Sequence, residues 1–571
     1  MKINVSTYWG PNRYSKRPSV VFCFEEIPEE KMSAMQRSFV TLAKYLEKNF
    51  GYSHTFGHKR AIDRNDVFEF LSSASIFILN YVRGDLEENG YTTDNAVPVL
   101  FVEFHKPELT AKAVNILLKL LFRGSKGKEH EVYSILNTFW DECQRGHPDF
   151  QAHALITAAK SKNLYYQNLD KKVWLYGMGA KSKIFFETST VEDLQSDVKT
   201  DKLSGKKIFN TVGAPTARYK IVRDRAELLA AAHDIGFPCV VKPVHSDSGR
   251  GVTANVKTLD DVEFAYTEAR KFIGKSNEIM VEKHVPGRDY RLLFLRGDFI
   301  GCASSVAPFV IGDGAKSIRE LIDIVNSKRT RNLYASNYLR PIKIDASVKE
   351  ALSVQSCDLK TVLKPGQKVT LRRNTNLGGG GSTELFENVH HDVLVHAKEI
   401  ARCCGLHSVG IDYITEDISK SPSASCGKFT ELNKMPGVPL FLAAGYDIGR
   451  LGDQFLGNRV GNIELNLFIF QKERCKELLQ SYSGECAIFL PDTVVKKSKK
   501  FKVENGHFRQ LIGKVLSDKQ LKSLDIIASL EFVEQYGFPT EHISTVFVGK
   551  FCKTRIVCET IEKLNCRVQC A

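Results

Sequence analysis

The segment PCVVKPVHSDSGRGV (238–252) joins an apolar strand to a polar loop that contains glycine. The strand ends at Lys242, and Gly249 and Gly251 follow in the loop. Glycine has no Cβ, so such a loop can bring backbone N–H groups close to phosphate oxygens. Lys242 would add a positive charge at the strand end. The segment predicts a phosphate-binding loop, although taken alone the pattern is also typical of a surface turn.

Two flanking segments strengthen this interpretation. Upstream, Asp201 and Lys202 precede the helix-like stretch GKKIFNTVG. Downstream, EIMVEKHVPGRDYRLLFLRGDFIGCAS (278–304) predicts a strand, a turn and then a hairpin. Glu282 and Asp289 stand at the two ends of that turn, where carboxylates could receive the donors of adenine and ribose. The alternative for isolated charges of this kind is a solvated turn.

A pair of predicted strands carries candidate metal ligands. VGIDYIT (409–415) and KFTELNKMPG (428–437) read as adjacent antiparallel strands, joined by a serine-rich loop. Glu431 and Asn433 are two residues apart and therefore face the same side of a strand. Asp412 interrupts an apolar strand, which is costly unless the carboxylate has a partner. Hard oxygen ligands of this kind suit Mg²⁺, and this interpretation is favoured over two strands with polar outer faces.

The remaining sequence predicts an α/β (α+β) protein with several domains. Residues 1–165 alternate short apolar runs of strand type (SVVFCFEEI, SIFILNYV, VPVLFVEF) with helical stretches and form an expected N-terminal α/β domain. Residues 166–455 hold the motifs, with an inserted segment at about 305–370. Residues 456–571, which contain the lysine run KKSKKFK (496–502), form an expected small α/β region of unknown role.

Composition restricts the environment and the partners. The net charge of +14 favours anionic partners without choosing among them. The 14 cysteines include no C-x-x-C pattern, which favours a reducing compartment. The N-terminus lacks the apolar core of a signal peptide, and no apolar run is long enough to span a bilayer. We therefore expect a cytoplasmic protein without a membrane partner.

In order and spacing, the motifs together resemble the ATP-grasp superfamily. The closer resemblance is to the ATP-grasp module of cyanophycin synthetase. It lies in PGRDYRLLFLRGDFIG, VIGDGAKSIRELIDIVN (310–326), LRRNTNLGGGGST (371–383) and YWGPNRYS (8–15). The resemblance implies an ATP-grasp fold that uses ATP and Mg²⁺.

It also implies a role for each matching position. The nucleotide would contact Lys202, Lys242, Ser246, Ser248, Gly249, Gly251, Glu282, Val285 and Asp289. Asp412, Glu431 and Asn433 would hold Mg²⁺. Arg291 and Arg372 would act with Lys242 as catalytic groups that stabilise the transferred phosphoryl group or the substrate carboxylate. Arg372, Asn374, Gly380 and Gly381 would shape the substrate site.

The implied activity is an ATP-dependent ligation that forms an amide bond through an acyl phosphate, on an amino acid or a short acidic peptide. The sequence departs from the family in one motif, since Asn433-Lys434-Met435-Pro436-Gly437 replaces the usual N-A-A-P-G. The family's Mur-ligase-like half has no counterpart among these motifs.

Two other hypotheses stay open. One is a ligase similar to glutathione synthetase, which shares the nucleotide site but lacks the VIGDG segment. The other is a non-catalytic basic protein on a degenerate ATP-grasp scaffold, suggested by the lysine run. We expect no nucleic-acid partner, because no aromatic residues suited to base stacking are interleaved with the lysines. The sequence leaves homo-oligomerisation open.

Overall fold

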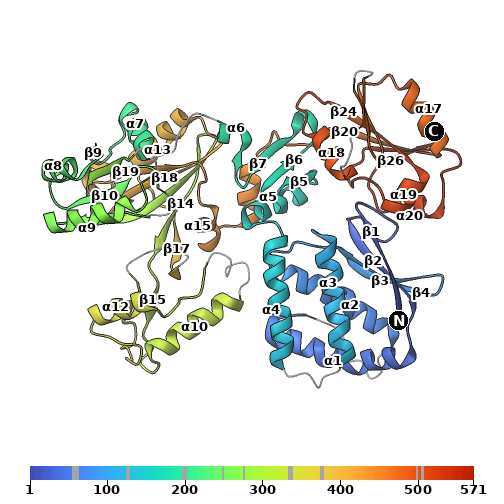
Figure 1. Ribbon diagram of the computed structural model, residues 1–571, viewed down its shortest axis with the longest axis horizontal. Coiled ribbons are helices and arrows are strands. Elements are labelled where there is room, and N and C mark those ends of the chain that lie inside the picture. Colours follow the sequence, from blue (N-terminus) through green and yellow to red (C-terminus); the bar gives the residue numbers. More distant parts are fainter. Residues whose placement is uncertain are drawn as a thin grey trace. The chain divides into compact units, whose positions relative to one another are not determined.

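The computed structural model describes residues 1–53, 63–123, 129–195, 202–246, 250–273, 277–331, 339–372, 379–496, 499–502 and 507–570. The chain divides into two compact units (Figure 1). Unit 1 joins residues 1–184 to residues 456–571, and unit 2 comprises residues 185–455. Both units combine helices and strands, which confirms the predicted α/β (α+β) class. In the described ranges no helix is long and apolar enough to cross a membrane.

The N-terminal part of unit 1 is an antiparallel sheet packed against helices. Its elements are β1 (Lys2–Tyr8), β2 (Ser19–Glu26), α1 (Glu29–Phe50), α2 (Arg64–Asn80), β3 (Asn89–Asp94), β4 (Val97–Glu103), α3 (Pro107–Arg123), α4 (Glu129–Gly146) and α5 (Phe150–Ser161). The strand order is β1-β2-β4-β3. Alternate residues of β2, such as Phe22 and Phe24, enter a core shared with Phe39 of α1 and Phe68 of α2.

One expected strand of this region is a helix. The expectation that SIFILNYV (75–82) forms a strand is wrong, because its first six residues lie within α2. The side chains of Asp63 and Asp66 form a capping box that fixes the start of α2. The helix is buried on several sides, so its apolar residues do not show the one-sided period of a surface helix. A short apolar run of this kind cannot be assigned from periodicity alone.

The C-terminal part of unit 1 is a mostly parallel sheet. Its elements are β20 (Glu464–Phe470), α17 (Lys472–Ser481), β21 (Cys486–Phe489), β22 (Thr493–Lys496), β23 (Lys499–Lys502), α18 (Phe508–Leu516), β24 (Ser523–Ser529), α19 (Leu530–Tyr536), β25 (Thr545–Val548), α20 (Arg555–Ile561) and β26 (Arg567–Cys570). The strand order is β23-β22-β21-β24-β20-β25-β26. Strand β20 runs parallel to β24 and β25, and β21 runs parallel to β24.

The helices cover both faces of this parallel sheet. Leu467 and Ile469 of β20 point to the face where α18, α19 and α20 pack. Phe468 and Phe470 alternate with them and meet Cys475 and other residues of α17 on the opposite face. Figure 1 shows α17 on one side of the strands and α19 and α20 on the other. The sheet is therefore wound on both faces.

Residues 166–184 pack with unit 1. This part of the chain contains β5 (Tyr166–Asp170), β6 (Val173–Tyr176) and β7 (Lys183–Phe186), followed by β8 (Ser189–Thr190) and α6 (Val191–Gln195). Leu175 and Met178 join the core of the parallel sheet beside Leu465 and Leu467. The sequence predicts that this stretch belongs to one domain with the residues up to 455. The predicted division into domains at 165 and 455 stays a prediction.

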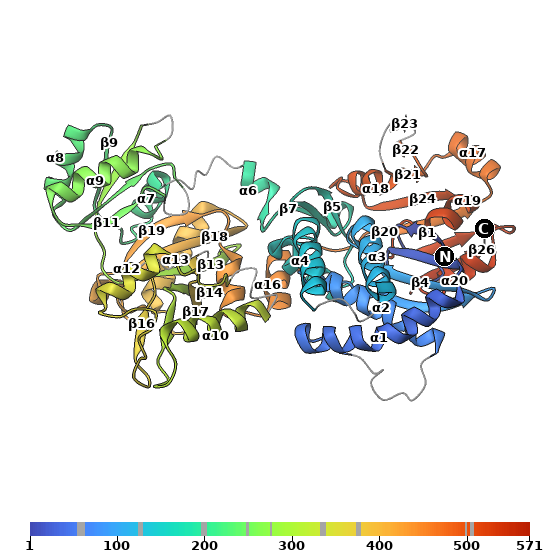
Figure 2. The same cartoon turned by 60° about the horizontal axis from the view of Figure 1, so that its bottom comes forward.

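The first sheet of unit 2 carries helices on one face. Its elements are α7 (Lys202–Thr211), β9 (Tyr219–Val222), α8 (Arg225–Ile235), β10 (Cys239–Pro243), β11 (Thr253–Val256), α9 (Leu259–Arg270) and β12 (Ile279–Lys283), and the strand order is β11-β10-β12-β9. Val241 and Val281 pack against Ala231 of α8 and Ala265 of α9. Figure 2 shows these two helices beside β9. Because side chains alternate along a strand, the intervening residues of β10 and β12 point to the opposite face.

The second sheet of unit 2 is antiparallel. It has the order β17-β14-β13-β18-β19, formed by β13 (Arg288–Leu295), β14 (Asp298–Val306), β17 (Ser382–Phe386), β18 (Ser408–Thr415) and β19 (Lys428–Asn433). The other elements are α13 (His391–Cys404), α14 (Pro422–Ser425), α15 (Val438–Ala443) and α16 (Ile448–Leu456). Leu292 and Ile411 pack against Ile400 of α13 on one face. The predicted antiparallel pairing of 409–415 with 428–437 is confirmed.

The inserted segment of unit 2 has a small core of its own. It contains β15 (Phe309–Ile311), α10 (Ile318–Arg331), α12 (Ala346–Val354) and β16 (Lys368–Thr370). Val310, Ile322, Leu352 and Val369 are buried together in it. The segment therefore folds as a small lobe attached to the antiparallel sheet through residues near 306 and 382.

Candidate functional site

A lysine cluster lies on the face of the first sheet that the helices leave open. Val240 stands opposite Glu282 in the ladder between β10 and β12, so Lys242, two residues on, shares a face with Glu282. The Glu282 carboxylate forms ion pairs with Lys242 and with Lys206 of α7, the latter at 2.9 Å between Nζ and Oε2. We call Lys202, Lys206 and Lys242 the lysine cluster.

Burial changes the pKa values of the charged groups in this cluster. Lys206 is fully buried, and its Nζ also donates a hydrogen bond of 2.8 Å to Thr216 Oγ1. Burial lowers the pKa of Lys206, because the charged form loses its hydration. Burial would raise the pKa of Glu282, but the charges of Lys242 and Lys206 outweigh that effect and lower it. The Glu282 carboxylate therefore stays ionised and holds the two ammonium groups.

The start of α7 connects the lysine cluster to the predicted phosphate loop. Lys202 is buried and its Nζ donates a hydrogen bond to the backbone oxygen of Ser246. Ser246 Oγ donates to the backbone oxygen of Arg250 at 3.0 Å. Gly251 has a φ of 71°, and a Cβ there would approach Phe272 and Pro243 to 3.0 Å. This close approach explains the glycine. The predicted Ser248 and Gly249 lie outside the described residues.

The second sheet presents a face with three carboxylates. In the strand register, Asp412 stands opposite Arg291 of β13 and opposite Glu431 of β19. The side chains of Arg291, Asp412 and Glu431 therefore point to the same face of the sheet. Arg291 Nη2 donates to Asp412 Oδ2 at 3.1 Å, and its Nε contacts the other carboxylate oxygen. Asn433 Nδ2 donates to Asp412 Oδ2 at 3.2 Å. Asp289 lies two residues before Arg291 and therefore shares this face. We call Asp289, Asp412 and Glu431 the carboxylate face.

Asp289 and Glu431 on this face both have a raised pKa. The Asp289 side chain is exposed, but the protein atoms crowded around its carboxylate and the charge of Asp412 raise its pKa to about 7. Burial and the Asp412 charge also raise the pKa of Glu431, while Lys202 and Lys242 oppose that shift. The lysine cluster lies next to this sheet, because Thr216, which accepts a hydrogen bond from Lys206 Nζ, donates one of 2.9 Å to the backbone oxygen of Phe429 in β19.

The oxygen donors of the carboxylate face fit a hard divalent cation. Asp412 and Glu431 supply carboxylate oxygens and Asn433 an amide oxygen, the chemistry that Mg²⁺ prefers. Within the described ranges, no group of three or more His, Cys, Asp or Glu side chains could hold a metal ion. A cation bound here would therefore need the Asn433 amide oxygen or oxygen atoms of its own ligand.

The remaining predicted residues fall in two places. Val285 is half-buried in the connection between β12 and β13, three residues after Glu282. Arg372 lies with the inserted segment, where its Nη2 donates to Lys343 O at 2.8 Å and to Asp345 Oδ2 at 2.6 Å. Gly380 has a φ of 90° and a Cβ there would meet Ile342 at 2.8 Å.

Gly381 beside it is buried, and the predicted Asn374 lies outside the described residues. Sequence reasoning missed Lys206, which the structure places at the centre of the lysine cluster. The available signal was its spacing of four from Lys202, which puts both lysines on one face of α7.

Comparison with known proteins agrees with the resemblance to ATP-grasp proteins. A family model described as an ATP-grasp domain matches residues 207–289, the part that contains Lys242 and Glu282. The cyanophycin synthetase of Crocosphaera subtropica is 32% identical over 315 residues, covering 53% of this chain and 36% of that protein. The cyanophycin synthetase of Trichormus variabilis is 26% identical over 375 residues, covering 63% of this chain and 41% of that protein.

More distant similarities extend to other proteins. The glutathione biosynthesis bifunctional protein GshAB of Streptococcus agalactiae is 28% identical over 246 residues, covering 41% of this chain and 32% of that protein. A crystal structure of a bifunctional glutathione synthetase from Pasteurella multocida aligns with a TM-score of 0.43 and 18% identity, covering 62% of this chain and 52% of that one. The chain spans less than half the length of each of these three curated relatives. Its residues 207–289 match the ATP-grasp domain, and over about half of its own length it is similar to cyanophycin synthetases.

Proposed function

We propose that the protein is an ATP-dependent carboxylate–amine ligase that forms an amide bond through an acyl phosphate. One observation supports the proposal: the lysine cluster lies next to the sheet of the carboxylate face, since Lys206 and β19 both bond to Thr216. The ATP-grasp match over residues 207–289 includes Lys242, Glu282 and Asp289. A site with surplus cations beside surplus carboxylates suits a polyphosphate bound together with a divalent cation.

The proposed nucleotide contacts follow from this charge arrangement. Lys202 and Lys242 contact the phosphates, with Ser246, Ser248, Gly249 and Gly251 closing over them. Glu282, Val285 and Asp289 receive the adenosine part. The Glu282 carboxylate also aligns Lys242, because their ion pair fixes the ammonium group at the end of β10.

Mg²⁺ is the proposed metal, held by Asp412, Glu431 and Asn433. When bound, it would neutralise charge on the transferred phosphoryl group. Around it, Arg291 is held in place by Asp412 and by the backbone oxygen of Pro436, to which its Nη1 donates at 3.0 Å. A guanidinium fixed in this way can stabilise developing negative charge without reorganising.

The proposed reaction has two steps. A substrate carboxylate oxygen attacks the γ-phosphorus of ATP, which releases ADP and leaves an acyl phosphate. An amine then attacks the acyl carbon, the phosphate leaves, and the amine nitrogen loses a proton. Arg372, Asn374, Gly380 and Gly381 are the proposed substrate contacts. An amino acid or a short acidic peptide is the proposed substrate, which the net charge of +14 supports.

A second candidate is a ligase of the glutathione type. It is favoured by the similarity of the chain to the glutathione biosynthesis protein of Streptococcus agalactiae over 246 residues. Both candidates share the nucleotide chemistry and differ in the carboxylate and the amine. Product identification separates them.

The test is ADP release from ATP in the presence of panels of amino acids and dipeptides, followed by mass spectrometry of the products. We expect ADP and phosphate only when a carboxylate and an amine are both present, with a product mass equal to their sum minus water. AMP and pyrophosphate as products would exclude the acyl-phosphate route. Carboxylate-independent ATP hydrolysis as the only activity would exclude the ligase.

A further inference from the structure

The parallel sheet of unit 1 has a crevice at its carboxyl edge. The chain leaves β20 at Phe470 into α17 and leaves the neighbouring strand β24 at Ser529 into α19. These two helices pack on opposite faces of the sheet. In doubly wound α/β sheets, ligands bind outside the carboxyl ends of two strands whose connections diverge in this way.

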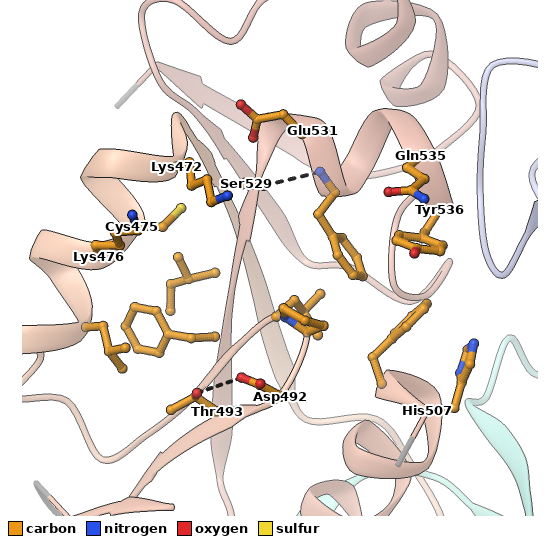
Figure 3. Close-up of a pocket in the computed structure, with 17 residues that line it drawn as sticks. Lys472, Cys475, Lys476, Asp492, Thr493, His507, Ser529, Glu531, Gln535 and Tyr536 are labelled. Carbon is orange, nitrogen blue, oxygen red and sulfur yellow. Dashed lines mark hydrogen bonds between the residues drawn. The ribbon is translucent and has the colours of Figure 1, made fainter. Parts of the chain in front are cut away.

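A cavity of about 770 Å³ occupies this position. Residues of α17, α19, the end of β21 and the start of α18 line it, as Figure 3 shows. Its size falls within the range of small-molecule sites, which is about 300–1,000 Å³. The cavity lies entirely within unit 1, so it is separate from the ATP-grasp site in unit 2.

The floor of the cavity is apolar and aromatic. Phe489, Phe508 and Phe532 are buried side chains that contribute to it, and Tyr536 stands at its edge. Phe508 lies 5.0 Å from Phe532, centroid to centroid, in an edge-on arrangement. Such a floor favours a planar or aliphatic group over a strongly hydrated one.

The rim of the cavity carries charges of both signs on separate elements. Lys472 and Lys476 lie one helical turn apart on α17, while Glu531 lies on α19 and Asp492 follows β21. Across the described ranges, neither lysine has an ion-pair partner, nor has Glu531, and Asp492 has a loose one in Lys502 at 3.6 Å. Figure 3 shows Lys472 and Glu531 on the two helices that face each other across the opening.

Two other lining residues contribute no charge. Burial raises the pKa of Cys475 to about 11, so its thiol is neutral at physiological pH. Burial also lowers the pKa of His507, whose ring therefore stays neutral there. The fixed charges at the rim are consequently two ammonium groups and two carboxylates.

We propose that this crevice binds a zwitterionic α-amino acid or short peptide with an aromatic or aliphatic side chain. The ligand carboxylate meets Lys472 and Lys476, its ammonium group meets Glu531 on the facing helix, and its side chain rests on the phenylalanine floor. A polyphosphate is disfavoured, because Glu531 and Asp492 would repel it. The inference does not depend on the ligase activity, since no residue of unit 2 takes part.

The test is calorimetric titration of the full chain with L-phenylalanine and two analogues that each lack one charge. Phenethylamine lacks the carboxylate and 3-phenylpropionate lacks the ammonium group. We expect L-phenylalanine to bind at least about tenfold more tightly than either analogue, the typical effect of one charge-assisted hydrogen bond. ADP serves as the competing anionic probe.

Variants assign each charge. In Lys472→Ala with Lys476→Ala, L-phenylalanine should bind about as weakly as phenethylamine binds to the native protein. In Glu531→Gln, the advantage of L-phenylalanine over 3-phenylpropionate should shrink by about tenfold. Arg474→Ala and Glu477→Gln are matched controls, because these residues pair with each other at 2.8 Å on α17 and do not line the cavity. Both controls should bind as the native protein does.

Three outcomes would overturn the proposal. The first is no detectable heat with any amino acid or with the dipeptide Phe-Gly. The second is equal binding of L-phenylalanine and both analogues, which would mean an apolar pocket without charge recognition. The third is ADP binding that is lost in the double lysine variant but unchanged in Glu531→Gln, which would identify an anion site. If variants of unit 2 lose ATP turnover but bind L-phenylalanine unchanged, this binding site is confirmed as separate from the proposed ligase activity.

Discussion

The lysine cluster and the carboxylate face of unit 2 carry opposite charge imbalances. In the lysine cluster, Lys206 and Lys242 share the carboxylate of Glu282, while Lys202 bonds to the backbone oxygen of Ser246. On the carboxylate face, three carboxylates surround the single guanidinium of Arg291. The pKa values respond accordingly, because Glu282 is shifted down while Asp289 and Glu431 are shifted up.

Neither surface is balanced in charge by itself. A ligand that places phosphate oxygens on the lysine cluster and a divalent cation on the carboxylate face would balance both. The charge of each surface therefore indicates the charge of the group that binds to it. Substitutions on one surface at a time test this assignment.

The largest effect is expected from emptying the carboxylate face. Glu431→Ala with Asn433→Ala should lower the rate of ADP release by about 10²–10³-fold or more, the cost of removing one preorganised charge partner in a catalytic site. The rate is measured with the substrate pair identified by the panel. Glu384→Ala is the matched control, because this exposed side chain of β17 pairs with Arg288 at 2.7 Å. Native turnover in a folded double variant would contradict the metal assignment.

A smaller effect, on stability, is expected within the lysine cluster. Lys206→Met removes one partner of the buried Glu282, and the free energy of unfolding should fall by about 3 kcal/mol. Denaturant titration measures it. Adding Glu282→Gln to Lys206→Met should recover part of the loss, since the uncompensated carboxylate is then gone. Lys207→Met, at the exposed neighbouring position, should change stability by less than about 0.5 kcal/mol.

The smallest effect is a pH dependence on the carboxylate face. The folded pKa of Asp289, about 7, lies above its unfolded value near 4, so its contribution to stability is present at acid pH and lost as pH rises through 7. Asp289→Asn should therefore be more stable than the native protein at pH 8, by about 1 kcal/mol after allowance for solvent screening, and show no such gain at pH 4.

Thermal melts at the two pH values measure this difference. Asp417→Asn provides a control of opposite sign, because hydrogen bonds from Ser419 lower the Asp417 pKa. Equal shifts for Asp289→Asn at pH 4 and pH 8 would show that Asp289 does not interact with the carboxylate face.

The sequence predicts most of the two surfaces of unit 2, because local rules determine them. The alternation of β10, β18 and β19 places Lys242, Asp412 and Glu431 on defined faces, and the structure pairs Asp412 directly with Glu431. The partner of a buried charge is less predictable. Lys206 meets Glu282 only because α7 packs across the sheet, and this packing is a tertiary contact that no local pattern contains.

Other features required information from distant parts of the chain. The helix that includes Phe70 and Ile78 has an apolar sequence because it is buried on several sides, so the run SIFILNYV is misleading as a strand signal. The grouping of Leu175 with Leu467 joins segments almost 300 residues apart, consistent with the separation of 297 between Tyr165 and its partner Asn462. The crevice of unit 1 depends on which face each helix covers, which the sequence leaves open.

The construction of unit 1 from both chain ends has a consequence for biosynthesis. Arg13 pairs with Glu559 at 2.8 Å, across 546 residues of sequence, and Trp9 donates a backbone hydrogen bond to Tyr536. At a translation rate of about 5–20 residues per second, the N-terminal segment waits roughly half a minute or longer for these partners. Unit 2 emerges from the ribosome complete in the meantime. Apolar side chains of residues 1–184 that pack with the C-terminal part, such as Leu175 and Met178, therefore lack their partners until that part has been synthesised.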